Sequence, residues 1–176
     1  GPQLTDPAKT LSLDDFAGKV VVINVWGQWC GPCRSEMPEL QKVYDATRAR
    51  GVAFLGIDVR DANRDAAVDF VVDRRITFPS IYDPAMRTMI AFGGKYPTTV
   101  IPSTIVLDRE HRVAAVFLRE LLGEDQSGQM AEIGFSLYTE LLERAVKSIK
   151  SGKLPDLVHT HPSETLRDAI EIDSGA

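Results

Sequence analysis

Hydrophobic and polar positions fall into blocks that predict strands and helices in alternation. Residues 19–26 are a nearly continuous run of Val, Ile and Trp, which is typical of a strand buried on both faces of a parallel sheet. Residues 34–50 instead place Met37, Leu40 and Val43 at helical spacing. The residues between these two blocks therefore lie in a strand-to-helix turn.

Further blocks continue this alternation as far as about residue 118. Their apolar runs and spacing predict strands at 52–58, 77–82, 103–107 and 113–118, and helices at 61–75 and 84–92. The last two strands form a hairpin, and His111 is expected to be a solvated residue of its turn.

The C-terminal part has a different pattern. Residues 121–153 predict a long amphipathic helix, because apolar side chains recur every three or four positions: Met130, Ile133, Leu137, Tyr138, Leu141, Leu142, Ala145, Val146 and Ile149. This helix could pack on the sheet or bind a partner. Residues 154–176 form an acidic tail that we expect to be mobile at its end. We therefore divide the chain into a core domain at 1–120, the helix and the tail.

Composition and charge exclude several classes of protein. The chain has 176 residues, 44% of them hydrophobic and 26% charged, as in ordinary globular proteins. A formal net charge of -5 provides no positive field for phosphates, so we expect no nucleic-acid partner. No apolar stretch approaches the roughly 18 residues that span a bilayer.

The two cysteines belong to one motif, Trp-Gly-Gln-Trp-Cys-Gly-Pro-Cys at 26–33. Cys30 falls at the predicted helix N-terminus, where free amide groups and the helix dipole favour a thiolate, so it is the expected nucleophile. Cys33 lies one turn further on the same face, where it can resolve a mixed disulfide.

Two other interpretations of this motif are weaker. A zinc site would need a second pair of ligands, but the three histidines, His111, His159 and His161, are remote and lack the usual spacing, so we predict no metal. A purely structural disulfide would stabilise little, because so short a loop is closed. Redox chemistry remains the favoured interpretation.

Together with this motif, several segments of the first 120 residues resemble one family. They are 11–19, 51–58, 78–83, Glu36-Met37-Pro38 and the Ile-Pro-Ser-Thr-Ile-Val-Leu-Asp stretch at 101–108. The region 10–120 resembles the TlpA/ResA-like thiol-disulfide oxidoreductases of the thioredoxin superfamily, which include reductants of cytochrome c maturation. The resemblance implies an α/β, thioredoxin-like fold: a central mixed β-sheet flanked by helices, with the family's extra strand-helix insertion and a final long helix.

The resemblance also implies substrate-binding residues. Pro102 is expected to be a cis proline facing the dithiol, with the backbone of Ile101 pairing with an extended substrate; from the residues alone, a trans proline that begins the strand stays open. We also assign Trp29, Gly31 and Pro32 to the binding surface, with Trp29 as an exposed aromatic side chain beside the nucleophile.

Glu36 is the candidate proton carrier. It follows Cys33 by three residues, so its carboxylate lies one turn away, and similar residues act as acid or base in the resembling family. Thioredoxins carry an Asp six residues before the first cysteine, but this chain has Asn24 there. Proton transfer to and from the cysteines must therefore use Glu36 or water. The alternative is a glutamate placed only to complement the helix dipole.

The favoured function is reduction of disulfides in extracytoplasmic protein substrates, with apocytochrome c as the candidate that the resemblance suggests. The resemblance implies a membrane-anchored protein, with electrons from an integral membrane thiol carrier and no cofactor besides the Cys30-Cys33 disulfide. We expect the tether to be missing from this sequence. Gly-Pro between the cysteines favours a reductant, as in thioredoxin at about -270 mV. An oxidase or isomerase, or an adaptor whose long helix binds a partner, remains an alternative.

Residues 121–153 also resemble a stretch of the bacterial transcription-repair coupling factor. No phosphate-binding loop of the type Gly-x-x-x-x-Gly-Lys-Ser/Thr occurs in the chain, so ATPase activity cannot be carried over. A chimera and a coincidental likeness both stay open.

Overall fold

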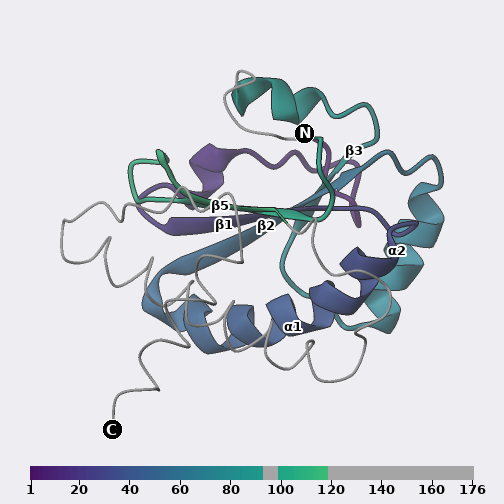
Figure 1. The fold of residues 1–176 in the computed structure, drawn as a ribbon, viewed down its shortest axis with the longest axis horizontal. Helices are drawn as coiled ribbons and strands as arrows, with labels where there is room; N and C mark the ends of the chain where they lie inside the picture. The colour runs from purple at the N-terminus through teal and green to yellow at the C-terminus, as the bar shows by residue number, and fades with distance from the viewer. Residues whose placement is uncertain (93–98, 119–176) are drawn as a thin grey trace, which may run out of the picture.

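Five strands form one mixed sheet in the order β3-β2-β1-β4-β5 (Figure 1). The computed structural model describes residues 1–92 and 99–118. In chain order the elements are η1 (Leu13–Phe16), β1 (Val20–Trp26), α1 (Gly31–Thr47), η2 (Arg48–Arg50), β2 (Val52–Val59), α2 (Arg64–Asp73), β3 (Ser80–Asp83), η3 (Arg87–Phe92), β4 (Ser103–Leu107) and β5 (Val113–Leu118).

The strand directions confirm the predicted mixed sheet. β1 runs parallel to β2, and β2 runs parallel to β3, whereas β4 is antiparallel to both β1 and β5. The predicted thioredoxin-like arrangement of a sheet flanked by helices is therefore present. The predicted long helix at 121–153 and the acidic tail at 154–176 lie outside the described residues.

The sheet separates two hydrophobic cores. We call the face covered by α1 and α2 the α1 face; its core includes Val22, Trp26, Phe54 and both cysteines (Figure 1). On the opposite face, η1 and η3 cover a second core around Val21, Ile23 and their neighbours. Every residue of β1 and β2 is buried, so the two central strands form a rigid support for the turn that follows β1.

The start of α1 differs from the sequence prediction. The helix begins at Gly31 and not at 34, because Cys30 acts as its N-cap and Pro32 occupies the first turn, where its missing N–H costs nothing. Pro38 lies inside the helix, which continues to Thr47.

Two other boundaries differ because polar side chains take up the backbone groups there. β3 begins at Ser80 and not at 77, since the Thr77 amide donates to Gln41 Oε1 over 2.8 Å and the Gln41 side chain donates back to the Thr77 hydroxyl over 2.8 Å. α2 begins at Arg64 and not at 61 because the Asn63 side chain caps it. The helix predicted at 84–92 is a shorter 3-10 helix, η3.

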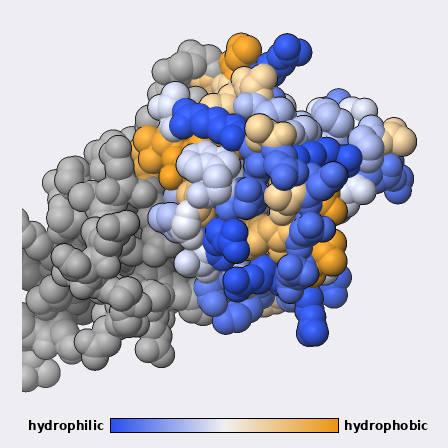
Figure 2. Space-filling model, turned by 90° about the vertical axis from the view of Figure 1, so that its right-hand side faces the viewer, coloured by the Kyte–Doolittle hydropathy of each residue, from blue (hydrophilic) through white to orange (hydrophobic). Residues whose placement is uncertain are grey.

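The surface that carries α2 is mostly hydrophilic, and its hydrophobic areas are small and separate (Figure 2). Among the large hydrophobic residues, Trp29, Val72 and Ile90 are exposed. None of the described helices is both long enough and apolar enough to cross a bilayer.

Gly56 is a specific test of packing on the α1 face. A Cβ at this position would stand against the Ser80 hydroxyl well inside van der Waals contact, and 2.9 Å from Trp26 Nε1. We expect Gly56→Ala to lower the free energy of unfolding by about 1–3 kcal/mol, measured by urea denaturation of the oxidised protein. Adding Ser80→Ala should recover part of that loss, whereas unchanged stability of the single variant would contradict this packing.

Candidate active site

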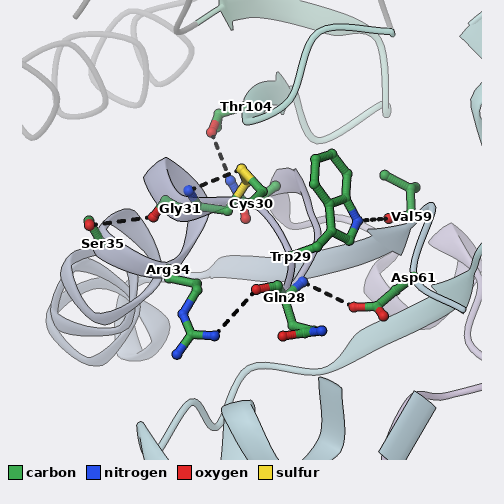
Figure 3. Close-up of a disulfide and its surroundings, with 11 residues drawn as sticks. Gln28, Trp29, Cys30, Gly31, Arg34, Ser35, Val59, Asp61 and Thr104 are labelled. Atoms are coloured by element: carbon green, nitrogen blue, oxygen red, sulfur yellow. Dashed lines mark hydrogen bonds between the residues drawn. A yellow bond between two sulfur atoms is a disulfide. The ribbon is translucent and has the colours of Figure 1, made fainter. Parts of the chain in front are cut away.

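Cys30 and Cys33 form a disulfide at the N-terminus of α1, directly after the turn that follows β1 (Figure 3). The S–S distance is 2.06 Å, and the Cys33 amide donates to Cys30 Sγ over 3.2 Å. Cys30 is 5% exposed and Cys33 is 1% exposed. The first-turn amide that points at Cys30 Sγ would stabilise negative charge there once the disulfide opens.

The turn before Cys30 is held by the end of β2 and the loop that follows it. The Gln28 amide donates to Asp61 Oδ2 over 3.1 Å, and the Trp29 indole N–H donates to the Val59 carbonyl over 3.1 Å (Figure 3). Gly27 is required for this approach, since a Cβ there would lie 2.5 Å from Trp29 Nε1 and 3.0 Å from the Val59 carbonyl oxygen. The nucleophile is therefore presented by a turn that β2 fixes in place.

The segment before β4 completes the site. The Ile101–Pro102 peptide bond is cis, as the resemblance implied. Ile101 packs against the hydrophobic core that contains both cysteines, so the structure brings these predicted residues together. Arg60 donates to the Thr99 carbonyl over 3.3 Å and thereby ties this segment to the end of β2.

The remaining predicted residues surround the disulfide. The Trp29 side chain is 48% exposed, as expected for an aromatic residue beside the nucleophile. Gly31 and Pro32 are exposed at the start of α1. Glu36 is half-buried, with its Oε2 atom shielded from solvent. The catalytic roles predicted for these side chains remain predictions.

Asn24 in β1 pairs with Thr104 in β4. It is 1% exposed, and its side-chain amide donates to the Thr104 hydroxyl over 3.4 Å. Thr104 extends from β4 toward the disulfide (Figure 3). The position that holds an Asp in thioredoxins is therefore part of a neutral pair.

Among the buried acidic residues that the sequence did not predict, Asp58 and Asp61 lie at the end of β2 and just after it. Asp58, near the end of β2, is 0% exposed, and burial raises its pKa to about 8, with the charge of Asp61 adding to the effect. Asp61 is 2% exposed and accepts the amides of Gln28 and Asn63. The signal for Asp58 was an acidic residue inside the apolar run Val-Ala-Phe-Leu-Gly-Ile-Asp-Val at 52–59.

Across residues 1–92 and 99–118, no three His, Cys, Asp or Glu side chains lie close enough together to hold a metal ion. His111 lies in the β4–β5 turn with a positive φ of 58°, and its Nε2 is 3.2 Å from the Phe16 carbonyl oxygen. His159 and His161 lie outside the described residues.

Comparison with known proteins places this geometry among redox proteins. The AhpC/TSA family matches residues 3–116. A thiol-disulfide oxidoreductase ResA from Bacillus cereus is 29% identical over 125 residues, which cover 71% of this chain and 69% of ResA.

Two solved structures are more similar in sequence. A secreted thiol-disulfide isomerase from Corynebacterium glutamicum is 43% identical, with a TM-score of 0.67, and the match covers 81% of this chain and 82% of that one. A DsbF homologue from Corynebacterium diphtheriae is 42% identical, with a TM-score of 0.67 and coverage of 84% and 82%.

The fold and the Cys30–Cys33 pair define a thiol-disulfide oxidoreductase of the thioredoxin superfamily. The predicted similarity to ResA-like enzymes is confirmed by the relatives themselves. Because the family match covers more than half of the sequence, the chain belongs to the AhpC/TSA family.

The raised pKa of Asp58 predicts a specific pH dependence of stability. Between the ordinary value of 3.8 and about 8, the folded protein holds a proton on Asp58 that the unfolded chain has released. Stability from this group is therefore lost as pH rises through that window, by at most about 1.4 kcal/mol per pH unit. Asp58→Asn removes this dependence.

The measurement is the free energy of unfolding of the oxidised protein at several values of pH between 5 and 8. We expect the difference between Asp58→Asn and the wild type to grow in favour of the variant as pH rises. Asp69→Asn, which neutralises an exposed carboxylate on α2, is the control and should follow the wild type. Parallel curves for the wild type and Asp58→Asn would contradict the prediction.

Proposed function

We propose that this oxidoreductase reduces disulfides in extracytoplasmic protein substrates, with cytochrome c maturation as its setting. The observation that carries the proposal is the Cys30–Cys33 disulfide at the N-terminus of α1, packed beside the cis Ile101–Pro102 segment. A reversible pair in this position can exchange two electrons with a substrate without any cofactor.

Reduction of the substrate takes two exchange steps. The Cys30 thiolate attacks a substrate disulfide, so that a mixed disulfide with Cys30 forms and one substrate thiolate leaves. Cys33 then loses its proton and attacks Cys30 Sγ, which forms the Cys30–Cys33 disulfide and releases the second substrate thiolate. Two electrons have passed to the substrate, and both of its thiolates take up protons.

The neighbouring residues have distinct roles in this scheme. The α1 amide at Cys33 stabilises the Cys30 thiolate, and Glu36 exchanges a proton during the resolving step. The exposed Trp29 side chain, with Gly31 and Pro32, forms the surface against which the substrate lies. The backbone of Ile101 pairs with an extended substrate segment, as in other cases of strand addition.

The relatives support the location and the redox chemistry. The solved relative from Corynebacterium glutamicum is described as secreted, and the ResA proteins are named oxidoreductases. We therefore infer an extracytoplasmic site of action. An integral membrane thiol carrier would return the pair to the dithiol form by donating two electrons.

Isomerisation is the second candidate function. The 43% identical relative is described as a thiol-disulfide isomerase. An isomerase uses the same attack by Cys30 but leaves before Cys33 resolves the mixed disulfide, so the net oxidation state of the substrate is unchanged. The stability of the Cys30–Cys33 disulfide relative to the dithiol distinguishes the two functions.

The redox equilibrium of the cysteine pair tests the direction. In defined dithiol buffers we expect a reduction potential close to that of thioredoxin, about -270 mV, as suits a reductant. A value near that of the strong oxidant DsbA, about -120 mV, would reverse the proposed electron flow, and an intermediate value with net disulfide reshuffling would favour the isomerase.

Single cysteine substitutions test the order of the two attacks. Cys33→Ser should retain attack by Cys30 but accumulate the mixed disulfide with a model disulfide protein, because nothing resolves it. Cys30→Ser should lose reductase activity and form no adduct, since the buried Cys33 is inaccessible. Mass spectrometry of the non-reduced products is the measurement, with the double Ser variant as control. Adducts formed mainly through Cys33 would overturn the assignment.

A further inference from the structure

Arg60 lies at the junction between the two halves of the site. One half is the turn that carries the nucleophile, which Val59 and Asp61 hold on either side of Arg60 in the chain (Figure 3). The other half is the segment that leads to Pro102, which Arg60 itself contacts at the Thr99 carbonyl. Three consecutive residues therefore hold both halves of the site.

The backbone of Arg60 is in the left-handed region, with a φ of 54°. A residue with a Cβ is unfavourable there, so its neighbours must impose the conformation. The Arg60 amide donates to the Pro84 carbonyl over 3.2 Å, and its side-chain Nε donates to Met86 Sδ over 3.2 Å. Met86 is itself left-handed, with a φ of 56°. Two left-handed residues from separate loops thus contact each other through their side chains.

The guanidinium group of Arg60 uses different nitrogen atoms for its two side-chain contacts. Nε donates to the Met86 sulfur, whereas Nη2 donates to the Thr99 carbonyl over 3.3 Å. Met86 and Ile101 both pack against the hydrophobic core on the face opposite α1. Because the guanidinium is planar and its donors have a fixed geometry, Arg60 sets the position of Thr99 relative to an anchored residue.

These contacts are better explained by positioning than by stability. Arg60 is exposed, and hydrogen bonds of an exposed side chain stabilise a fold little because water competes for the same groups. The left-handed backbone is also unfavourable in itself. The net effect of Arg60 is therefore to fix where the segment before Pro102 lies.

A protein substrate must meet both halves of the site at once. In the proposed function, its sulfur lies at Cys30 while its backbone pairs with Ile101. The spacing between the two halves therefore decides how well an extended substrate fits, whereas a small disulfide needs Cys30 alone. A misplacement of about 1 Å can slow a reaction between positioned groups about 100-fold.

We propose that Arg60 is a positioning residue that sets the preference of this enzyme for extended protein disulfides over small disulfides. It holds the segment before Pro102 at the separation from Cys30 that an extended substrate spans. It acts through Thr99 and Ile101 and not on the reacting sulfur atoms. The inference rests on the proposed function, since it requires a substrate backbone that pairs with Ile101, but it does not depend on the direction of electron flow.

Single-turnover kinetics of the reduced protein test the proposal. The dithiol form is mixed with increasing concentrations of insulin, whose disulfides lie in a polypeptide, or of hydroxyethyl disulfide, which has no backbone to pair with Ile101. Oxidation of the Cys30–Cys33 pair is followed by thiol trapping and mass spectrometry. The data give a second-order rate constant for each disulfide and a half-saturating concentration for insulin.

Arg60→Gly should lower the rate constant for insulin about 10-fold, mainly through a higher half-saturating concentration, because Gly accepts the left-handed backbone but lacks the guanidinium. The rate constant for hydroxyethyl disulfide should stay within about twofold of the wild-type value.

Arg75→Gly is the matched control. Arg75 is exposed and has a φ of 55°, but it follows α2. Because β2 and β3 are parallel, α2 returns the chain to the end of the sheet away from Cys30. Arg75→Gly should therefore follow the wild type with both disulfides.

Two results would overturn the proposal directly. Equal losses with both disulfides would mean that Arg60 acts on the dithiol, and unchanged kinetics with insulin would mean that its contact with Thr99 has no effect on the substrate. Arg60→Lys keeps the charge but lacks the planar group, so it should lose activity with insulin as Arg60→Gly does. If Arg60→Gly does not fold, as judged by thermal unfolding of the oxidised protein, Arg60→Lys decides, and full activity of that variant overturns the proposal.

The wild type separates this proposal from the function beneath it. A wild-type protein that reacts no faster with insulin than with hydroxyethyl disulfide would contradict the proposed function, and with it the inference. A wild type that prefers insulin, beside an Arg60→Gly variant with the same preference, would contradict the role of Arg60 alone.

Discussion

The chemistry of this protein depends on the position of Cys30 as the N-cap of α1. The hydrogen bond from the Cys33 amide to Cys30 Sγ uses one of the donors that a helix start leaves free. Only the short turn 27–30 separates this helix start from the fully buried strand β1. The same geometry that satisfies the helix start therefore also places the sulfur where negative charge is stabilised.

This arrangement is held by contacts that cross between elements. Val59 at the end of β2 and Asp61 in the loop after it hold the turn before Cys30, and Arg60 between them reaches the segment before Pro102. One loop thus fixes both the nucleophile and the segment proposed to bind the substrate. Its backbone is irregular at Arg60, which has a positive φ of 54°. A strained residue at this junction is consistent with a loop shaped for the site and not for the helix that follows.

The sequence predicted the elements that hydrophobic pattern alone determines, and it missed those that depend on partners distant in the chain. β1, β4 and β5 were predicted closely because burial dictates continuous apolar runs. The start of β3 was wrong because Gln41 of α1 binds Thr77, a pairing that no local pattern reveals. The site pair, Cys30 and Cys33, followed from spacing, and the cis Pro102 followed only from resemblance.

The two faces of the sheet differ in the polarity of the residues that the central strands bury. Opposite the α1 face, the central strands bury an almost wholly apolar set that includes Ile23, Leu55 and Ile105, whereas the α1 face buries Asn24 and Asp58 beside the cysteines. Both faces are equally inaccessible to water, so folding alone would favour apolar residues on each. Along β1 and β2 on this face, the polar residues Asn24 and Asp58 lie toward the carboxyl ends of the strands, whereas Val22 and Phe54, nearer the other end, are apolar. Within these two central strands, the buried polar side chains therefore lie toward the end of the sheet from which the turn to Cys30 leaves.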